Sequence, residues 1–315
     1  MDGQSTNSTS KIGFHILAFS TSENGRFLLL AVIFLVYFVI LIGNILILTL
    51  VCLVPQLHTS MYFFLSNLSV LDNFYVSTTL PKLLYITNTG DHYVSYNNCI
   101  TQLFYFLFFA DTESFLLVTM AIDRYVAICF PLHYSLIMNR RVCVLLAFPA
   151  WFMAMVNALI LTCFIHELTF IGIKEIDNFF CDLKALITAS SSDKNFLRKF
   201  ILVDGMFIGA VPMLLILTSY ACIISTILKI KSSVGRKKTF SSCTSHIIIV
   251  VVYYGSALSV YMQYSLQQDK QDKVFAVMFV TLVPMLNPIV YSLRNKDITR
   301  ALQRAVSGFK TIPET

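Results

Sequence analysis

The sequence predicts an all-α membrane protein: a seven-transmembrane-helix bundle with a short amphipathic C-terminal helix. Of the 315 residues, 57% are hydrophobic and only 13% are charged, and the mean hydropathy is +0.73. A soluble domain carries about 25% charged residues, so this composition argues against a cytosolic enzyme, a disordered chain or a nucleic-acid-binding domain. The hydrophobic residues also fall into seven long runs, and a helix needs about 20 of them to cross a bilayer.

The seven runs are the predicted membrane spans. They cover residues 27–51, 61–83, 99–128, 142–163, 196–228, 240–264 and 274–293. The second and third contain acidic residues, which are rare inside a membrane and usually functional. The seventh is short and contains Pro284 and Pro288, so we expect it to be kinked. Residues 1–26 then form an extracellular tail, 27–293 the helical domain, and 294–315 a cytoplasmic segment.

The distribution of charge predicts the orientation. With the N-terminus outside, 13 basic and three acidic residues lie on the cytoplasmic side, and the outer side is neutral. Basic residues gather on the cytoplasmic side of membrane proteins, and both dense basic clusters fall there. The glycosylation sequon that begins at Asn7 agrees, because it must face the lumen to be modified. The net charge of +6 therefore indicates a basic inner face and not a nucleic-acid partner.

The segment after the seventh span has one apolar face, with basic residues elsewhere. We expect it to lie on the inner leaflet as a short helix, and a solvated tail is the alternative. The apolar residues are Ile298, Leu302, Ala305 and Phe309.

Six motifs, in order along nearly the whole chain, resemble those of the odorant receptors, a branch of the rhodopsin-like (class A) G-protein-coupled receptors. They are Gly43-Asn44, the run 57–69 followed by Asp72, the run 120–134 with Asp123-Arg124-Tyr125, Ser219-Tyr220, the run 238–246, and the run 284–295 with Asn287-Pro288. The sequence departs from the family pattern at Ser60, where proline is usual, and at Ile122, where tyrosine is usual.

The resemblance implies a plasma-membrane receptor for small, mostly apolar volatile molecules. Ligand binding would shift a pre-existing equilibrium and activate a stimulatory, olfactory-type G protein, which raises cyclic AMP. The alternative is an ion channel or small-solute transporter that uses the buried acids, although these form no obvious line. An enzyme is not expected, because no nucleophile-and-base arrangement or metal triad is evident, and we expect no cofactor other than a sodium ion.

The resemblance also implies the residues of the G-protein switch. In the wider family the arginine of this motif is held by the neighbouring aspartate at rest and released towards the G protein. Here no acid lies between Lys229 and Asp269, so Arg124 has no acidic partner on the sixth helix. Its restraint must come from Asp123 or from polar side chains such as Tyr220. The expected switch residues are Asp123, Arg124, Tyr125, Tyr220, His246, Asn287, Pro288 and Tyr291.

A polar network is implied within the bundle. The resemblance places Asn44, Asp72, Glu113 and Asn287 together, as in a sodium-type pocket. Two carboxylates close together in a medium of low dielectric constant share a cation or a proton, because two bare anions repel each other. The alternative is a static network of structural waters.

Two further acids are expected near the ligand cavity between the third, fifth and sixth helices. Asp111 lies twelve residues, about 18 Å, before Asp123 on the same helix, and Asp204 lies eight residues before Pro212. They would either contact a polar group of the ligand or form a shared-proton pair or bonds to nearby hydroxyls. The apolar lining expected from the resemblance is Phe106, Leu107, Ala110, Phe207, Ile208, Tyr254, Ala257, Leu258 and Tyr261.

The resemblance implies one disulfide, between Cys99 at the head of the third span and Cys181 in the long outer loop. A second bridge, common in the family, is missing, since Ile171 and Ser191 occupy its positions. We therefore expect Cys163 to be unpaired and the loop to be looser than in relatives.

Overall fold

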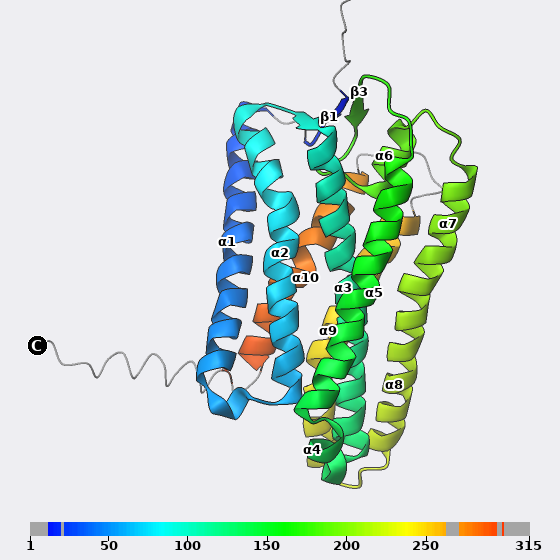
Figure 1. Cartoon of the computed structure of the whole chain (residues 1–315). Helices are drawn as coiled ribbons and strands as arrows, with labels where there is room; N and C mark the ends of the chain where they lie inside the picture. Colours follow the sequence, from blue (N-terminus) through cyan, green and yellow to red (C-terminus); the bar gives the residue numbers. More distant parts are fainter. Residues whose placement is uncertain (1–11, 20–21, 263–270, 295–297, 299–315) are drawn as a thin grey trace, which may run out of the picture.

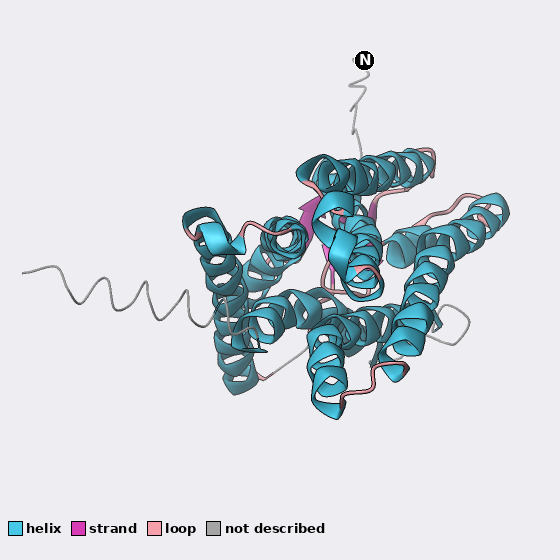
Figure 2. Cartoon of the chain, turned by 90° about the horizontal axis from the view of Figure 1, so that it is seen from below, coloured by secondary structure: helices cyan, strands magenta, loops and turns pink. Residues whose placement is uncertain are grey.

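The computed structural model describes residues 12–19, 22–262, 271–294 and 298. Within these residues seven long helical segments run side by side (Figure 1), and a view from below shows them nearly end-on (Figure 2). The segments are α1 (Glu23–Leu53), α2 (Ser60–Thr89), α3 (Tyr96–Cys129), α5 (Arg140–His166), α7 with α8 (Asn195–Gly205, Val211–Leu228), α9 (Ser233–Met262) and α10 (Gln271–Arg294).

The predicted spans and the helices agree in number and order, and most helices extend beyond the apolar runs. Five segments are long and apolar enough to cross a membrane: α1, α3, α5, the α7–α8 segment and α9. The other two, α2 and α10, carry Asp72 and Asn287, and α10 contributes a shorter apolar stretch, Phe275–Val290. Both of these helices therefore carry buried polar groups within an otherwise apolar segment.

Helix α5 shows how the bundle packs. Its buried face against α3 is made largely of small residues three or four apart, Ala147, Ala150, Ala154 and Ala158. Its large apolar side chains, such as Phe148, are exposed. Small residues let helices in a membrane approach closely, and large apolar side chains are stable against lipid tails. The arrangement is that of a helix with one face in the bundle and one in the bilayer.

A close contact between α1 and α10 explains the glycine of the first motif. A Cβ atom at Gly43 would lie 2.9 Å from Cβ and Cγ of Pro288. Any larger residue would push the two helices apart, at the level where Asn44 faces the interior.

One end of the bundle carries a small sheet that the sequence analysis does not predict. Its strands are β1 (Gly13–Ile16), β2 (Tyr93–Ser95) and β3 (Ile173–Ile176), in the order β2-β1-β3, with β1 antiparallel to β2 and parallel to β3 (Figure 1). The N-terminal segment expected as a plain tail therefore forms the central strand. A four-residue strand has too little pattern to be recognised, and its partners lie about 80 and 160 residues away.

The remaining elements are short. They are η1 (Pro55–Leu57), η2 (Pro131–His133), α4 (Tyr134–Ile137), α6 (Leu183–Ala189) and η3 (Met206–Ala210). The last is a π-helical turn between α7 and α8 that ends two residues before Pro212. Such a turn changes the helical register, so it rotates Asp204 relative to the rest of the fifth span.

Candidate functional site

The cytoplasmic end of α3 holds the predicted switch. Nη2 of Arg124 lies 2.5 Å from Oδ2 of Asp123 in a salt bridge, and the Asp123 side chain is only 1% exposed. The structure therefore places the arginine in the restrained arrangement that the resemblance implies. Tyr125, next in the chain, packs its ring edge-on against Phe130.

Two residues that the sequence analysis does not assign to the switch extend this contact. The hydroxyl of Tyr134, in α4, donates to Oδ1 of Asp123 at 2.8 Å. Since that proton is then used, Ser60 Oγ must donate to Tyr134 Oη, 2.7 Å away. Burial and the nearby Asp123 carboxylate raise the pKa of Tyr134 to about 12, so its hydroxyl stays protonated as this bond requires. We call Ser60, Tyr134, Asp123 and Arg124 the cytoplasmic clasp.

Ser60 stands where the family usually has proline, which has no hydroxyl to donate. The signal that could have identified it is this departure, although the sequence alone does not say which side chain it would meet. The clasp is thus fixed to α2 by a bond that a proline at this position could not make.

The fifth and sixth spans are joined by Tyr220 and His246. His246 Nε2 lies 3.1 Å from the carbonyl of Leu117, which can only accept, so Nε2 carries a proton. In the neutral ring Nδ1 then accepts from the Tyr220 hydroxyl at 2.8 Å. The two bonds of His246 together connect α8, α9 and α3. Of the other expected switch residues, Pro288 is buried and Asn287 belongs to the polar core, while the side chain of Tyr291 lies outside the described part of the chain.

The polar core is built from four helices. Asn44 of α1, Asp72 of α2, Glu113 of α3 and Asn287 of α10 are all 0–1% exposed. Asn287 Nδ2 donates to Asp72 Oδ2 at 2.8 Å. Asn44 Nδ2 donates to the carbonyl of Pro284 at 3.2 Å and so ties α1 to α10. The structure thus brings the four residues together, as expected from the resemblance.

Several oxygens in this core accept no bond. Among the described residues, no partner is found for Asp72 Oδ1, Glu113 Oε1, Asn44 Oδ1, Asn287 Oδ1 and Ser69 Oγ. The charges of Asp72 and Glu113 also act on each other. Buried polar atoms are nearly always satisfied, and a set of oxygens without donors suits a cation or ordered waters.

The second acidic pair, Asp111 and Asp204, is bridged by an amide. Nδ2 of Asn157, in α5, donates to Oδ2 of Asp111 at 2.9 Å and to Oδ2 of Asp204 at 3.4 Å. The two acids are therefore neighbours joined through one amide, an arrangement compatible with both the shared-proton and the ligand-contact hypotheses. Asn157 is not among the predicted site residues, although it is the only amide within residues 142–163, and that isolation is the signal that could have identified it.

Above the polar core the predicted lining residues of α3 meet the outer loop. The ring of Phe106 lies 4.5 Å from that of Phe180, between centroids, and 5.5 Å from that of Tyr75. Leu107 is buried, and the carbonyl of Ala110 accepts from the Tyr253 hydroxyl at 2.8 Å. Phe180 of the loop is thus a wall of this region that the sequence analysis does not name.

The lining residues expected on the fifth and sixth spans differ in how deeply they are buried. Ser114 Oγ donates to the carbonyl of Ile208 at 3.1 Å, so the hydroxyl of Tyr254, 3.0 Å away, donates to Ser114. Tyr254 is buried, whereas Ile208 and Ala257 are half-buried. Phe207 and Leu258 are 55% and 50% exposed, which does not support a place in a closed pocket. The side chain of Tyr261 lies outside the described part of the chain.

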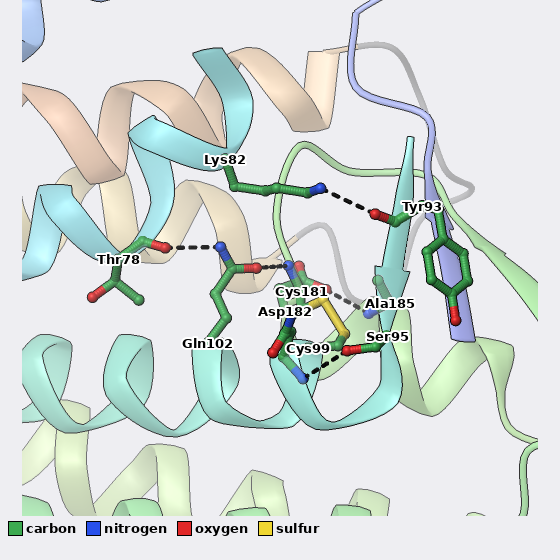
Figure 3. Close-up of a disulfide and its surroundings, with 10 residues drawn as sticks. Thr78, Lys82, Tyr93, Ser95, Cys99, Gln102, Cys181, Asp182 and Ala185 are labelled. Atoms are coloured by element: carbon green, nitrogen blue, oxygen red, sulfur yellow. Dashed lines mark hydrogen bonds between the residues drawn. A yellow bond between two sulfur atoms is a disulfide. The ribbon is translucent and has the colours of Figure 1, made fainter. Parts of the chain in front are cut away.

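Cys99 and Cys181 form the predicted disulfide, which joins the start of α3 to the outer loop (Figure 3). Gln102 lies beside it, accepting from the backbone N–H of Cys181 at 2.9 Å and donating to the carbonyl of Thr78 at 2.8 Å. Cys163 is unpaired and exposed, as expected.

The outer loop is held at other points as well. Where the second bridge is missing, the N–H of Ser191 donates to the carbonyl of Thr169 at 3.1 Å. Lys273 of α10 forms an ion pair with Asp177 and donates to the carbonyl of Ala18. Asn7 and the amphipathic segment lie outside the described residues, apart from Ile298, which is buried.

A bundle of seven long helical segments, with an arginine restrained at the inner end of the third and a disulfide at its outer end, is the arrangement of a rhodopsin-like G-protein-coupled receptor. Comparison with known proteins narrows this class. The family model described as "Olfactory receptor" matches residues 33–308, and the chain belongs to that family.

Curated relatives agree over nearly their whole length. Olfactory receptor 1E1 of Homo sapiens is 42% identical over 306 residues, 97% of this chain and 98% of the relative. Olfactory receptor 1E2 of Gorilla gorilla gorilla is 42% identical over 301 residues, 95% and 96% of the two chains. Olfactory receptor 1M1 of Homo sapiens is 39% identical over 302 residues, 96% of each. Members of this family are multi-pass plasma-membrane receptors and not enzymes, and the matches give no support to the channel or transporter alternative.

Proposed function

We propose that the protein binds a small, mostly apolar volatile molecule between its helices and activates a stimulatory, olfactory-type G protein, which raises cyclic AMP. Membership of the family supports odorant binding and G-protein coupling. The cytoplasmic clasp is the observation that carries the proposal for this chain. A cation held at the inner mouth of the bundle by one buried carboxylate can be released when the helices move.

The ligand site proposed lies beneath the outer loop, beside Phe106, Phe180 and Tyr254. Aromatic and aliphatic side chains dominate there, and binding sites of this kind gain affinity by apolar contact, with a few polar groups fixing the orientation. Asp111 and Asp204 are the candidates that we propose for such polar groups. Their bond to Asn157 supports the structural alternative equally.

We further propose that the polar core binds a sodium ion. The unpartnered oxygens of Asp72, Glu113 and Asn287 come from three helices, so a cation among them would stabilise one arrangement of the bundle. Static waters remain the competing hypothesis, and the sodium dependence of agonist potency distinguishes the two.

The experiment is a ligand screen against a cyclic AMP reporter in cells that express the receptor. We expect Arg124→Ala to abolish the agonist response while surface expression persists, because the residue that engages the G protein is gone. Lys231→Ala, which removes an exposed cytoplasmic cation outside the clasp, is the matched control and should respond normally. A full response from well-expressed Arg124→Ala would disprove the proposed switch.

A further inference from the structure

A cavity of about 690 Å³ lies at the cytoplasmic end of the bundle, away from the proposed ligand site. We call it the inner groove. It lies between the inner ends of α1 and α2 on one side and α4 and α5 on the other. Its lining residues include Phe63, Val70, Trp151, Ser60, Tyr134 and Arg140. Its volume falls within the range of about 300–1,000 Å³ that is usual for small-molecule sites.

The groove follows the inner half of the membrane. Its lining on α2 runs from Ser60 to Val70, ten residues or about 15 Å of helix, which is half of the hydrocarbon thickness of about 30 Å. Val70 is 36% exposed, so the groove is open to the bilayer at this level. At its inner wall Trp151 Nε1 donates to Asn67 Oδ1 at 3.1 Å, which satisfies both polar groups and leaves an apolar surface.

The cytoplasmic mouth of the groove is positively charged. Arg140 lines the groove, and Arg141 follows it in the first turn of α5; both are exposed, and no acidic residue lies in that turn. The N-terminus of a helix already carries a partial positive charge. The charges of the two arginines add to it and make the local potential more positive. Asp123 is the only acid at the cytoplasmic ends of the described helices, and the clasp already occupies it.

We propose that the inner groove binds an anionic phospholipid of the cytoplasmic leaflet, with an acyl chain against Phe63, Val70 and Trp151 and the headgroup at Arg140 and Arg141. An apolar slot half a membrane long requires a chain, and the uncompensated cations at its mouth select a negative headgroup. The inner leaflet supplies such lipids. The bound chain packs against Ser60 and Tyr134, so the site lies directly beside the clasp.

The test uses the purified full-length receptor in nanodiscs of phosphatidylcholine that contain phosphatidylserine with a photoreactive acyl chain. After irradiation we expect cross-links within residues 60–70 and at the α5 lining residues Cys143 and Trp151. Unlabelled phosphatidylserine should compete and unlabelled phosphatidylcholine should not. Arg140→Gln and Arg141→Gln should each weaken that competition by roughly fivefold, and Val70→Trp should remove the groove cross-links by filling the slot.

Two matched variants control for surface effects. Lys229→Gln removes a cytoplasmic cation away from the groove, and Val144→Trp adds the same bulk to an exposed position of α5 outside it, so both should cross-link like the wild type. The arginine variants are surface changes and test the proposal even if Val70→Trp does not fold. Equal competition by phosphatidylcholine, preferential competition by a sterol, or unchanged cross-linking in Val70→Trp and both arginine variants would each overturn it.

Discussion

Two pairs of carboxylates lie inside this bundle, and their surroundings differ. Asp72 and Glu113 are fully buried, and the amide of Asn287 in α10 donates to Asp72. Asp111 and Asp204 are only partly buried and share a single amide, that of Asn157. The first pair keeps unpartnered oxygens, whereas the second is bridged by a neutral side chain. The first pair therefore has the unpartnered acceptors that the proposed sodium site requires, whereas the second pair is joined through one protein amide.

The largest effect should come from removing the donor of the first pair. We expect Asn287→Leu to destabilise the receptor by about 2–3 kcal/mol, because a bond to a charged group is lost where water cannot replace it. The apparent melting temperature of the purified protein should fall by several degrees. In an Asp72→Asn background the same change should cost less than half as much, and an equal cost in both backgrounds would show that packing, not the carboxylate, is responsible.

The second-largest effect should be that of sodium, which we expect to act through the first pair only. If a cation binds at Asp72 and Glu113, raising the sodium concentration at constant ionic strength should shift agonist potency, by about tenfold for a typical coupling energy. The shift should vanish in Asp72→Asn and persist in Asp111→Asn. Dose–response curves in the cyclic AMP assay measure it, and the absence of a shift in the wild type would favour the static water network.

A smaller effect is expected from the bridge of the second pair. Asn157→Leu should cost about 1 kcal/mol, because Asp111 and Asp204 are partly exposed and can regain other partners. The melting temperature should fall less than in Asn287→Leu. A larger loss here than at Asn287 would reverse the proposed difference between the pairs.

The smallest effect should come from a carboxylate outside the membrane. Bonds from the N–H of Tyr93 and the hydroxyl of Tyr85 lower the pKa of Asp91, together with the charge of Lys82. Its stabilising contribution is therefore complete above the ordinary aspartate pKa and is lost as the pH falls through the lower folded value. Asp91→Asn should shift the melting temperature at pH 7 less than Asn157→Leu does, since the group is exposed to solvent. A drop as large as that of Asn287→Leu would contradict this.

Much of the fold follows from local sequence properties. Seven apolar runs, the bias of basic residues and the order of the motifs predict the helices, their orientation and the family. The disulfide and the polar core follow from positions that the family motifs fix. Each of these depends on the composition of a segment or on its place along the chain, which one sequence contains in full.

The contacts between distant side chains could not be predicted in the same way. The bridge of Asn157 to Asp204 depends on a π-helical turn at Met206–Ala210, which rotates the helix in a manner that regular periodicity does not reveal. The bond from Ser60 to Tyr134 joins residues 74 positions apart, and the sheet joins the N-terminal segment to two loops.

The sequence by itself thus determined that the chain is a membrane receptor of this family and where its helices lie. Only the tertiary structure decided which polar groups are satisfied, how the clasp is fixed to α2, and that a groove with a basic mouth opens to the inner leaflet. The physical reason is that hydropathy acts on each segment separately, whereas hydrogen bonds and cavities depend on the rotation and spacing of helices relative to one another.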